Sequence, residues 1–204
     1  MLGLPGSTEI RKIITKKKVF EHFGAEMSAE RRKSLDADVA RITLVNEVSP
    51  ISVNIPEGEN DRSFFVILVA LRQKDFDKQN IVFLAKMFGQ KLVLVLEYEG
   101  QQALAVWQTL LILSPWSAPD SLRVELNGLD LDKVWENIVA GLAGVQVAQG
   151  TTLEEQLAQA QQREKLQKEI AKLEKMAWAE KQPKRKFEYM KQIGELQAKL
   201  EGLS

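Results

Sequence analysis

The C-terminal quarter of the chain is the feature that most restricts its fold. Residues 152–181 contain neither glycine nor proline, and apolar side chains recur there at helical spacing among many charged ones. Thr152 and Glu155 form a T-x-x-E capping box, in which each side chain pairs with a backbone N–H at the start of a helix. Pro183 interrupts this segment before a second striped one. Because Gln182 precedes proline and is disfavoured in the α conformation, we predict an antiparallel helical hairpin with its turn near 181–184.

The apolar stripe of this hairpin has the spacing of a coiled-coil seam. In the first arm, apolar residues step by four, three and four from Leu166 to Ala177. Two interpretations remain open: the stripe closes the hairpin against itself, or it docks onto a partner protein or a second copy of the chain. The candidate partner-binding residues are Leu166, Ile170, Leu173, Phe187, Met190 and Ile193.

The preceding part of the chain has mixed α/β patterning. Phe64–Leu71 is apolar without alternation, which is typical of a central strand covered on both faces. Val39–Val48 is rich in β-branched residues and is also predicted to be a strand. Asp77 and Asp130 are predicted to cap two amphipathic helices. We therefore expect an α/β (α+β) fold, a mixed sheet with flanking helices, over residues 1–150, and the helical hairpin over 151–204.

The remaining elements are assigned from local patterns. We expect one or two short helices ending at Gly24, and a helix following the cap residue Ser28. Further strands are predicted at Ile51–Ile55, Leu92–Leu96, Ala103 toward Leu113, and Leu122–Leu126, with a tight turn at Glu99-Gly100.

Composition excludes several classes of protein. The 204 residues include no cysteine, so disulfides and thiolate metal sites are excluded. The longest apolar run falls far short of the roughly 20 residues that span a membrane. The start of the chain lacks the pattern of a signal peptide, so we expect a soluble, cytoplasmic protein. Because 28 lysines and arginines balance 28 aspartates and glutamates, the whole chain has no electrostatic bias toward nucleic acid.

No motif for catalysis is present. The sequence lacks the glycine-rich phosphate loops, the H-E-x-x-H zinc motif and the G-x-S-x-G nucleophile motif. We predict no catalytic, cofactor-binding or metal-binding residues and expect that the protein is not an enzyme.

One nuclease-like arrangement is left open. Residues 28–96 are predicted as helix, strand, strand, strand, helix, strand, the order of the core of restriction-enzyme-like nucleases. The third strand of that core normally carries a Glu-x-Lys motif, but the corresponding strand here ends Val69–Arg72, with alanine or leucine in place of the acid. The second strand supplies Asn54 but no aspartate. Because two-metal hydrolysis needs carboxylates, such a core would bind nucleic acid without cutting it.

Three basic clusters are candidate contacts to nucleic acid. They are Arg11 and Lys12 with Lys16–Lys18, then Arg31, Arg32 and Lys33, and then Lys181 with Lys184, Arg185 and Lys186. Each cluster offers charges for phosphate groups. The alternative is that they are solvated faces, and that the last cluster complements the C-terminal dipole of the first hairpin arm.

The chain resembles a bacterial family known as domain of unknown function 4391 (DUF4391). The residues that carry the resemblance are Leu2–Pro5, Asp38–Ile42, Asn46–Pro50, Lys74–Asp77, Asn80-Ile81, Gln90-Lys91, Leu129–Asp132, Trp135–Asn137 and Glu180–Pro183. The resemblance implies a genomic context beside type III-like restriction–modification and helicase genes. It implies no catalytic residues.

These observations lead to a hypothesis about function. We expect a non-enzymatic accessory or adaptor subunit of a bacterial DNA-processing or anti-phage defence complex. Its hairpin would dock onto a helicase or DNA methyltransferase subunit, or onto a second copy of the chain. The alternative is a divergent nuclease or nucleic-acid-binding module built on the α/β core.

Overall fold

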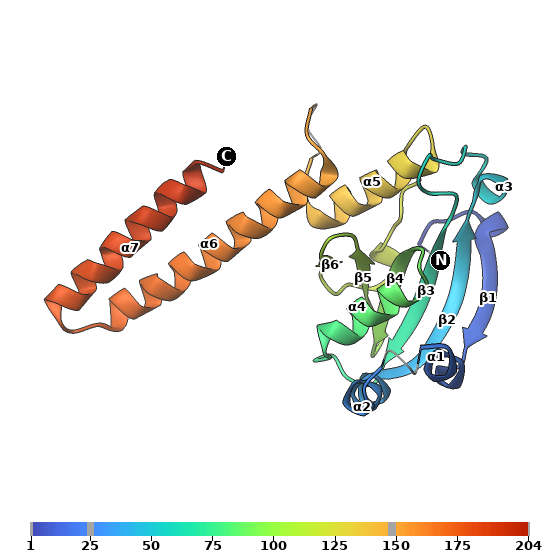
Figure 1. Cartoon of the computed structure of the whole chain (residues 1–204), viewed down its shortest axis with the longest axis horizontal. Coiled ribbons are helices and arrows are strands. Elements are labelled where there is room, and N and C mark those ends of the chain that lie inside the picture. Colours follow the sequence, from blue (N-terminus) through green and yellow to red (C-terminus); the bar gives the residue numbers. More distant parts are fainter. Residues whose placement is uncertain (1, 24–26, 147–149, 204) are drawn as a thin grey trace. The chain divides into compact units, whose positions relative to one another are not determined.

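The computed structural model describes residues 2–23, 27–146 and 150–203, with only the backbone at residue 22. The chain divides into two compact units, Met1–Gly144 and Val145–Ser204 (Figure 1). The first unit is a mixed α/β domain, and the second contains two long helices.

The first unit is built on a six-stranded mixed sheet, in which the spatial order of the strands follows the chain. The strands are β1 (Glu9–Ile14), β2 (Val39–Val48), β3 (Phe64–Leu71), β4 (Lys91–Tyr98), β5 (Gln101–Trp107) and β6 (Leu111–Leu113). Neighbouring strands are antiparallel, except that β3 and β4 run parallel and are joined by a helix. This sheet confirms the predicted α/β class.

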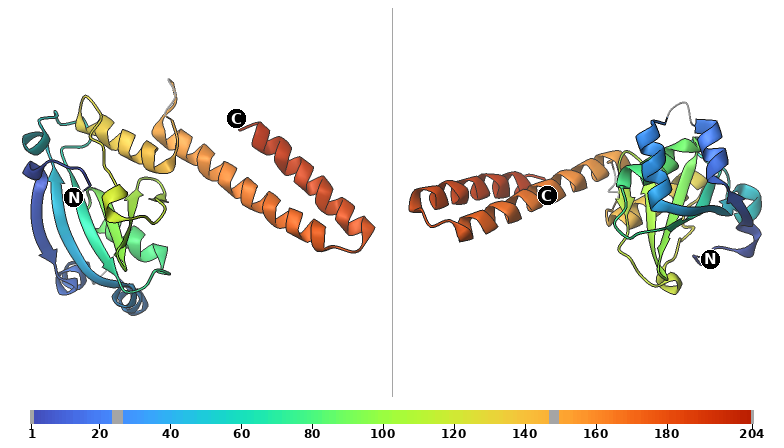
Figure 2. Two further views of the ribbon diagram at one scale, coloured as in Figure 1. Left: turned by 180° about the vertical axis from the view of Figure 1, so that it is seen from behind. Right: turned by 90° about the horizontal axis from the view of Figure 1, so that it is seen from below.

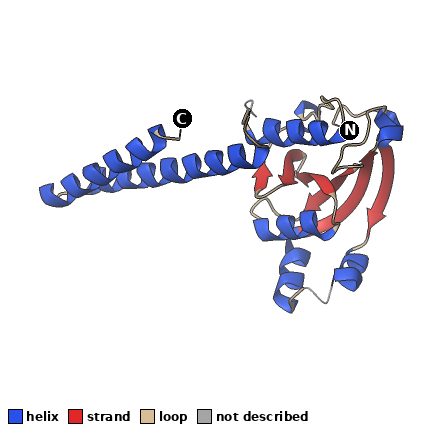
Figure 3. Ribbon diagram, turned by 45° about the horizontal axis from the view of Figure 1, so that its top comes forward, coloured by secondary structure: helices blue, strands red, loops and turns tan. Residues whose placement is uncertain are grey.

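Helices cover both faces of the sheet (Figure 3). One face carries α1 (Lys16–Phe23), α2 (Ala29–Asp38) and α4 (Lys78–Met87). Their apolar side chains pack on a row that includes Ile42 and Val69, which lie side by side on β2 and β3. The other face carries α5 (Leu131–Ala143), where the rings of Phe64 and Trp135 lie 5.7 Å apart.

Several local predictions are confirmed. Asp77 accepts a hydrogen bond from the N–H of Gln79 (2.9 Å) at the start of α4. Asp130 accepts one from the N–H of Lys133 (2.8 Å) at the start of α5. The turn between β4 and β5 contains Glu99 and Gly100, both with positive φ (45° and 76°), as the shortest hairpin turns require.

The helix predicted in the N-terminal segment is wrong at residues 10–14. These residues form β1 along the free edge of β2, and the helix begins only at Lys16. Arg11 has a φ of 56° where the pairing register shifts, and such a bulge weakens an exposed edge as a template for further pairing. Gly24, predicted to end this helical region, lies outside the described residues.

The predicted strand at Ile51–Ile55 is wrong. Pro50–Val53 form a short helix, α3, with proline in its first turn. Ser49 and Ser52 satisfy each other's backbone N–H groups, so a local capping box outweighs the alternation of apolar and polar residues. The predicted nuclease-like order of elements is therefore not formed as written, and β1 supplies the third antiparallel strand of the sheet.

Two further strand predictions need correction. The segment predicted to continue from Ala103 toward Leu113 is a hairpin of two strands, β5 and β6. Residues 122–126, all of which the structure describes, form no strand, although Val124 donates a hydrogen bond to the carbonyl of Leu2 (3.0 Å). Short 3-10 helices occur at Gly6–Thr8 and Pro119–Ser121.

The second unit is a helical hairpin of α6 (Leu153–Ala179) and α7 (Pro183–Glu201), which pack antiparallel (Figure 2). Both halves of the predicted capping box are present: Thr152 accepts from the N–H of Glu155, and Glu155 accepts from the N–H of Thr152. In the described parts of the chain, no helix has the length and apolar character needed to cross a membrane.

Candidate interaction surface on the helical hairpin

The seam between α6 and α7 is a small apolar core. Ile170, Leu173 and Ala177 from α6 are buried with Ile193 from α7. The partly buried side chains packed against them are Met176, Tyr189, Leu196 and Leu200. Three of the six candidate partner-binding residues, Ile170, Leu173 and Ile193, are therefore placed inside the hairpin, where they hold its helices together.

The other candidate residues have different surroundings. Leu166 is half-buried, whereas Phe187 and Met190 are 72% and 55% exposed. Phe187, Met190 and Gly194 are spaced i, i+3 and i+7, so they follow one another along one side of α7, which we call the α7 flank. A Cβ at Gly194 would meet no atom within 4 Å, so the backbone of α7 is open at this point of the flank.

The turn end of the hairpin, which we define as Trp178 with Lys181, Lys184, Arg185 and Lys186, combines an aromatic ring with positive charge. Trp178 lies in the last turn of α6 and is 89% exposed. The four basic side chains are exposed, and none of them forms an ion pair with any described residue.

The connection itself is ordered by Glu180, whose carboxylate accepts a hydrogen bond from the N–H of Gln182 (2.9 Å). Gln182 is the cap residue of α7 but makes no side-chain capping bond. The Glu180 carboxylate therefore stabilises the turn, and it forms no ion pair with any described cation.

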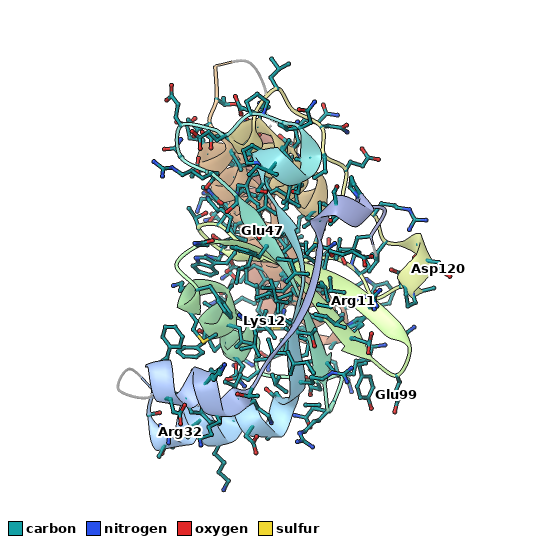
Figure 4. All side chains as sticks on the ribbon, turned by 90° about the vertical axis from the view of Figure 1, so that its right-hand side faces the viewer. Arg11, Lys12, Arg32, Glu47, Glu99 and Asp120 are labelled. Carbon is teal, nitrogen blue, oxygen red and sulfur yellow. The ribbon has the colours of Figure 1, made fainter. Side chains whose placement is uncertain are left out.

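The second basic cluster, on α2, is partly engaged in the α/β unit. Arg31 pairs with Asp77 (2.8 Å) and donates to Asn80 (3.2 Å), which ties α2 to the start of α4. The guanidinium of Arg32 lies 5.3 Å from the centre of the Phe20 ring. Lys33 is exposed and has no ion pair among the described residues. Figure 4 places Arg32 on α2, well apart from Arg11 and Lys12 on β1, so these cations do not form one patch.

A buried carboxylate organises the end of β3. Asp38 accepts hydrogen bonds from the side-chain amide of Gln73 (2.7 Å), the N–H of Asp77 (2.8 Å) and the side-chain amide of Asn80 (2.7 Å). It fixes the loop between β3 and α4. Within residues 2–23, 27–146 and 150–203, no group of three acidic or histidine side chains is arranged to hold a metal ion.

A second carboxylate, Asp132, is cradled by the loop before β3. It accepts hydrogen bonds from the backbone and side-chain N–H groups of Asn60 (both 3.1 Å) and from the N–H of Asp61 (2.7 Å). Burial raises the pKa of Asp132, but these hydrogen bonds outweigh burial and hold the pKa below its ordinary value. For Asp61, burial and the Asp132 charge raise the pKa, against the opposing effect of Lys91.

Sequence reasoning did not single out three of these features. Trp178 stands in no sequence motif, and the available local signal of its exposure is its position outside the seam register. The Asp38 network joins residues from three elements and therefore has no local pattern. The hydrogen bonds of Asp132 with Asn60 and Asp61 likewise join residues far apart in the sequence and have no local pattern.

Comparison with known proteins identifies the family but no activity. Among curated proteins and among solved structures, no protein matches the chain. A family model described as a domain of unknown function matches residues 2–200. The chain therefore belongs to the DUF4391 family.

Proposed function

We propose that this protein is a non-enzymatic accessory subunit of a bacterial DNA-processing complex of the restriction–modification or anti-phage type. The hairpin docks onto a helicase or DNA methyltransferase subunit. The choice of partner class rests on the genomic context that the family resemblance implies, and the choice of surface rests on the hairpin itself.

The observation that carries the proposal is the division of apolar residues within the hairpin. The seam is closed by its own side chains, so α6 and α7 form a preassembled arm that needs no partner to bury Ile170, Leu173 or Ile193. Phe187 and Met190 are not among the residues of that seam and remain exposed. Large apolar side chains spaced three to four residues apart on one side of a helix are the usual anchors when a helix binds a protein groove.

The α7 flank has further properties of a docking surface. Gly194 lets the backbone of a partner approach α7 closely, because no side chain stands above it. The hairpin is already folded, so docking avoids the entropic cost of ordering its helices on binding.

The test is purification of the tagged full-length protein from its source organism, with nuclease treatment and mass spectrometry. The wild type is expected to retain a helicase or methyltransferase, and the double variant Phe187→Ser/Met190→Ser is expected to lose it. Equal recovery with both forms would refute docking through the α7 flank. A matched control, Gln161→Ser/Gln162→Ser, changes two exposed residues of α6 and is expected to retain the partner.

A further inference from the structure

We infer that the turn end of the hairpin binds single-stranded nucleic acid, with the indole of Trp178 stacking on a base and the cations of the turn end contacting phosphates. This site is distinct from the α7 flank, and the inference does not depend on the identity of the protein partner.

The first argument comes from exposure of the tryptophan. A tryptophan side chain offers a large apolar surface, yet Trp178 is 89% exposed, whereas the seam of the hairpin buries other residues of α6. Proteins that bind single strands without sequence preference use exposed aromatic rings in this way, because every base has a flat face on which a ring can stack.

The second argument comes from the charges beside that ring. Lys184, Arg185 and Lys186 occupy the first turn of α7, which contains no acidic residue. Positive charge is unfavourable at the start of a helix, because the helix dipole places its positive end there. Three cations at this position are therefore unfavourable for α7, although they complement the C-terminal end of α6 at the same turn, and a polyanion bound to them would remove the conflict with α7.

The third argument is the absence of competition for these charges. In the described residues, the four cations of the turn end have no carboxylate within ion-pairing distance. By contrast, Lys168 in the middle of α6 pairs with Glu164, and Arg31 on α2 pairs with Asp77. Cations without an ion-pair partner are available to contact phosphates, whose counterions are released on binding.

The ring and the cations lie at the same end of the hairpin. Trp178 is one residue from the end of α6, and only residues 180–182 separate the two helices. Figure 2 shows this connection at the end of the arm, with α6 and α7 leaving it side by side. A strand of a few nucleotides therefore meets both the stacking surface and the charges.

The test uses fluorescently labelled single strands of oligo(dT) and oligo(rU), each about 15 nucleotides long, the upper range of a single-strand binding site. Fluorescence anisotropy with the full-length protein is expected to show binding to one or both strands. The logarithm of the affinity should fall with the logarithm of salt concentration with a slope of about −3, as expected for about four phosphate contacts. Stacking should also quench tryptophan fluorescence.

Two variants separate stacking from charge. Trp178→Ala is expected to weaken binding about tenfold and abolish the quenching, because a stacked base contributes that order of affinity. Trp178→Phe keeps a ring and is expected to restore most of the affinity. The triple variant Lys184→Gln/Arg185→Gln/Lys186→Gln should weaken binding at least tenfold and flatten the salt dependence.

The matched control is Lys165→Gln/Lys172→Gln/Lys199→Gln, which removes the same charge from exposed positions outside the turn end and should bind like the wild type. The flank variant Phe187→Ser/Met190→Ser should also keep its oligonucleotide affinity, so failure of the proposed docking function and failure of this site are distinguishable. Circular dichroism verifies that each variant retains its helices.

Three outcomes would overturn the inference. They are no binding of either strand by the wild type, equal binding by the wild type and the Trp178→Ala and triple variants, and binding of phosphatidylglycerol vesicles in place of oligonucleotides. The last result would assign the turn end to a membrane surface.

Discussion

At the scale of single residues, the loop before β3 depends on a glycine. A Cβ built on Gly58 would lie 2.1 Å from the Oδ1 atom of Asp132, so any side chain there displaces the carboxylate from its hydrogen bonds. We predict that Gly58→Ala lowers the free energy of unfolding by about 1–3 kcal/mol, measured by urea denaturation. Gly6→Ala is the control, because a Cβ at Gly6 meets no atom within 4 Å. Equal stability of the two variants would contradict this account of the loop.

The same carboxylate gives a pH dependence with a defined sign. Because Asp132 has a pKa below its ordinary value of 3.8 in the folded protein, its ionised form stabilises the fold. That contribution is complete above the ordinary pKa and is lost as the pH falls through the lower, folded value. The stability difference between the wild type and Asp132→Asn should therefore be largest at neutral pH and shrink below pH 3.8. A difference that is constant across this range would show that the hydrogen bonds do not depend on the charge.

At the scale of elements, the seam and the outer surface of the hairpin have separate roles. Ile170→Asp places a charge in the buried seam and should lower the stability of the hairpin by roughly 2–5 kcal/mol. Phe187→Ser removes an exposed ring and should change that stability by no more than about 0.5 kcal/mol. Thermal melting followed by circular dichroism distinguishes the two. If Phe187→Ser were as destabilising as Ile170→Asp, the ring would be part of the packing and not a free anchor.

Gly194 gives an element-scale prediction of opposite sign. It lies in the interior of α7, where glycine is less favourable than alanine by about 1 kcal/mol. Because a Cβ at this position meets no neighbouring atom, Gly194→Ala should stabilise the hairpin by up to about 1 kcal/mol in urea denaturation. A loss of stability would mean that α7 needs a glycine for its own conformation.

The accuracy of the sequence predictions followed the range of the interactions involved. The capping box at Thr152, the caps at Asp77 and Asp130 and the buried strand β3 are specified by nearby residues, and all are confirmed. The helix predicted over the β1 segment was wrong because the helical spacing rests on three isoleucines only, and backbone pairing with β2 outweighs so short a signal. At α3 the strand prediction was wrong because the reciprocal hydrogen bonds of Ser49 and Ser52 outweigh the alternation of apolar and polar residues.

At the scale of the whole molecule, the candidate site was partly predictable for the same reason. The hairpin and its seam register follow from periodicity, which is local to each helix. The rotation of α6 and α7 about their own axes decides which apolar residues of each helix face the other helix of the hairpin. That rotation leaves Phe187, Met190 and Trp178 exposed and buries Ile193, and no single-helix pattern specifies it.

The central claim is that the α7 flank contacts a partner protein. The most direct measurement is site-specific photocrosslinking in the source organism, with a photoreactive phenylalanine analogue placed at position 187 or 190. The account predicts adducts from both positions that contain a helicase or methyltransferase subunit, and none from position 161, an exposed site on α6. Adducts formed equally from position 161, or no adduct from positions 187 and 190, would contradict it.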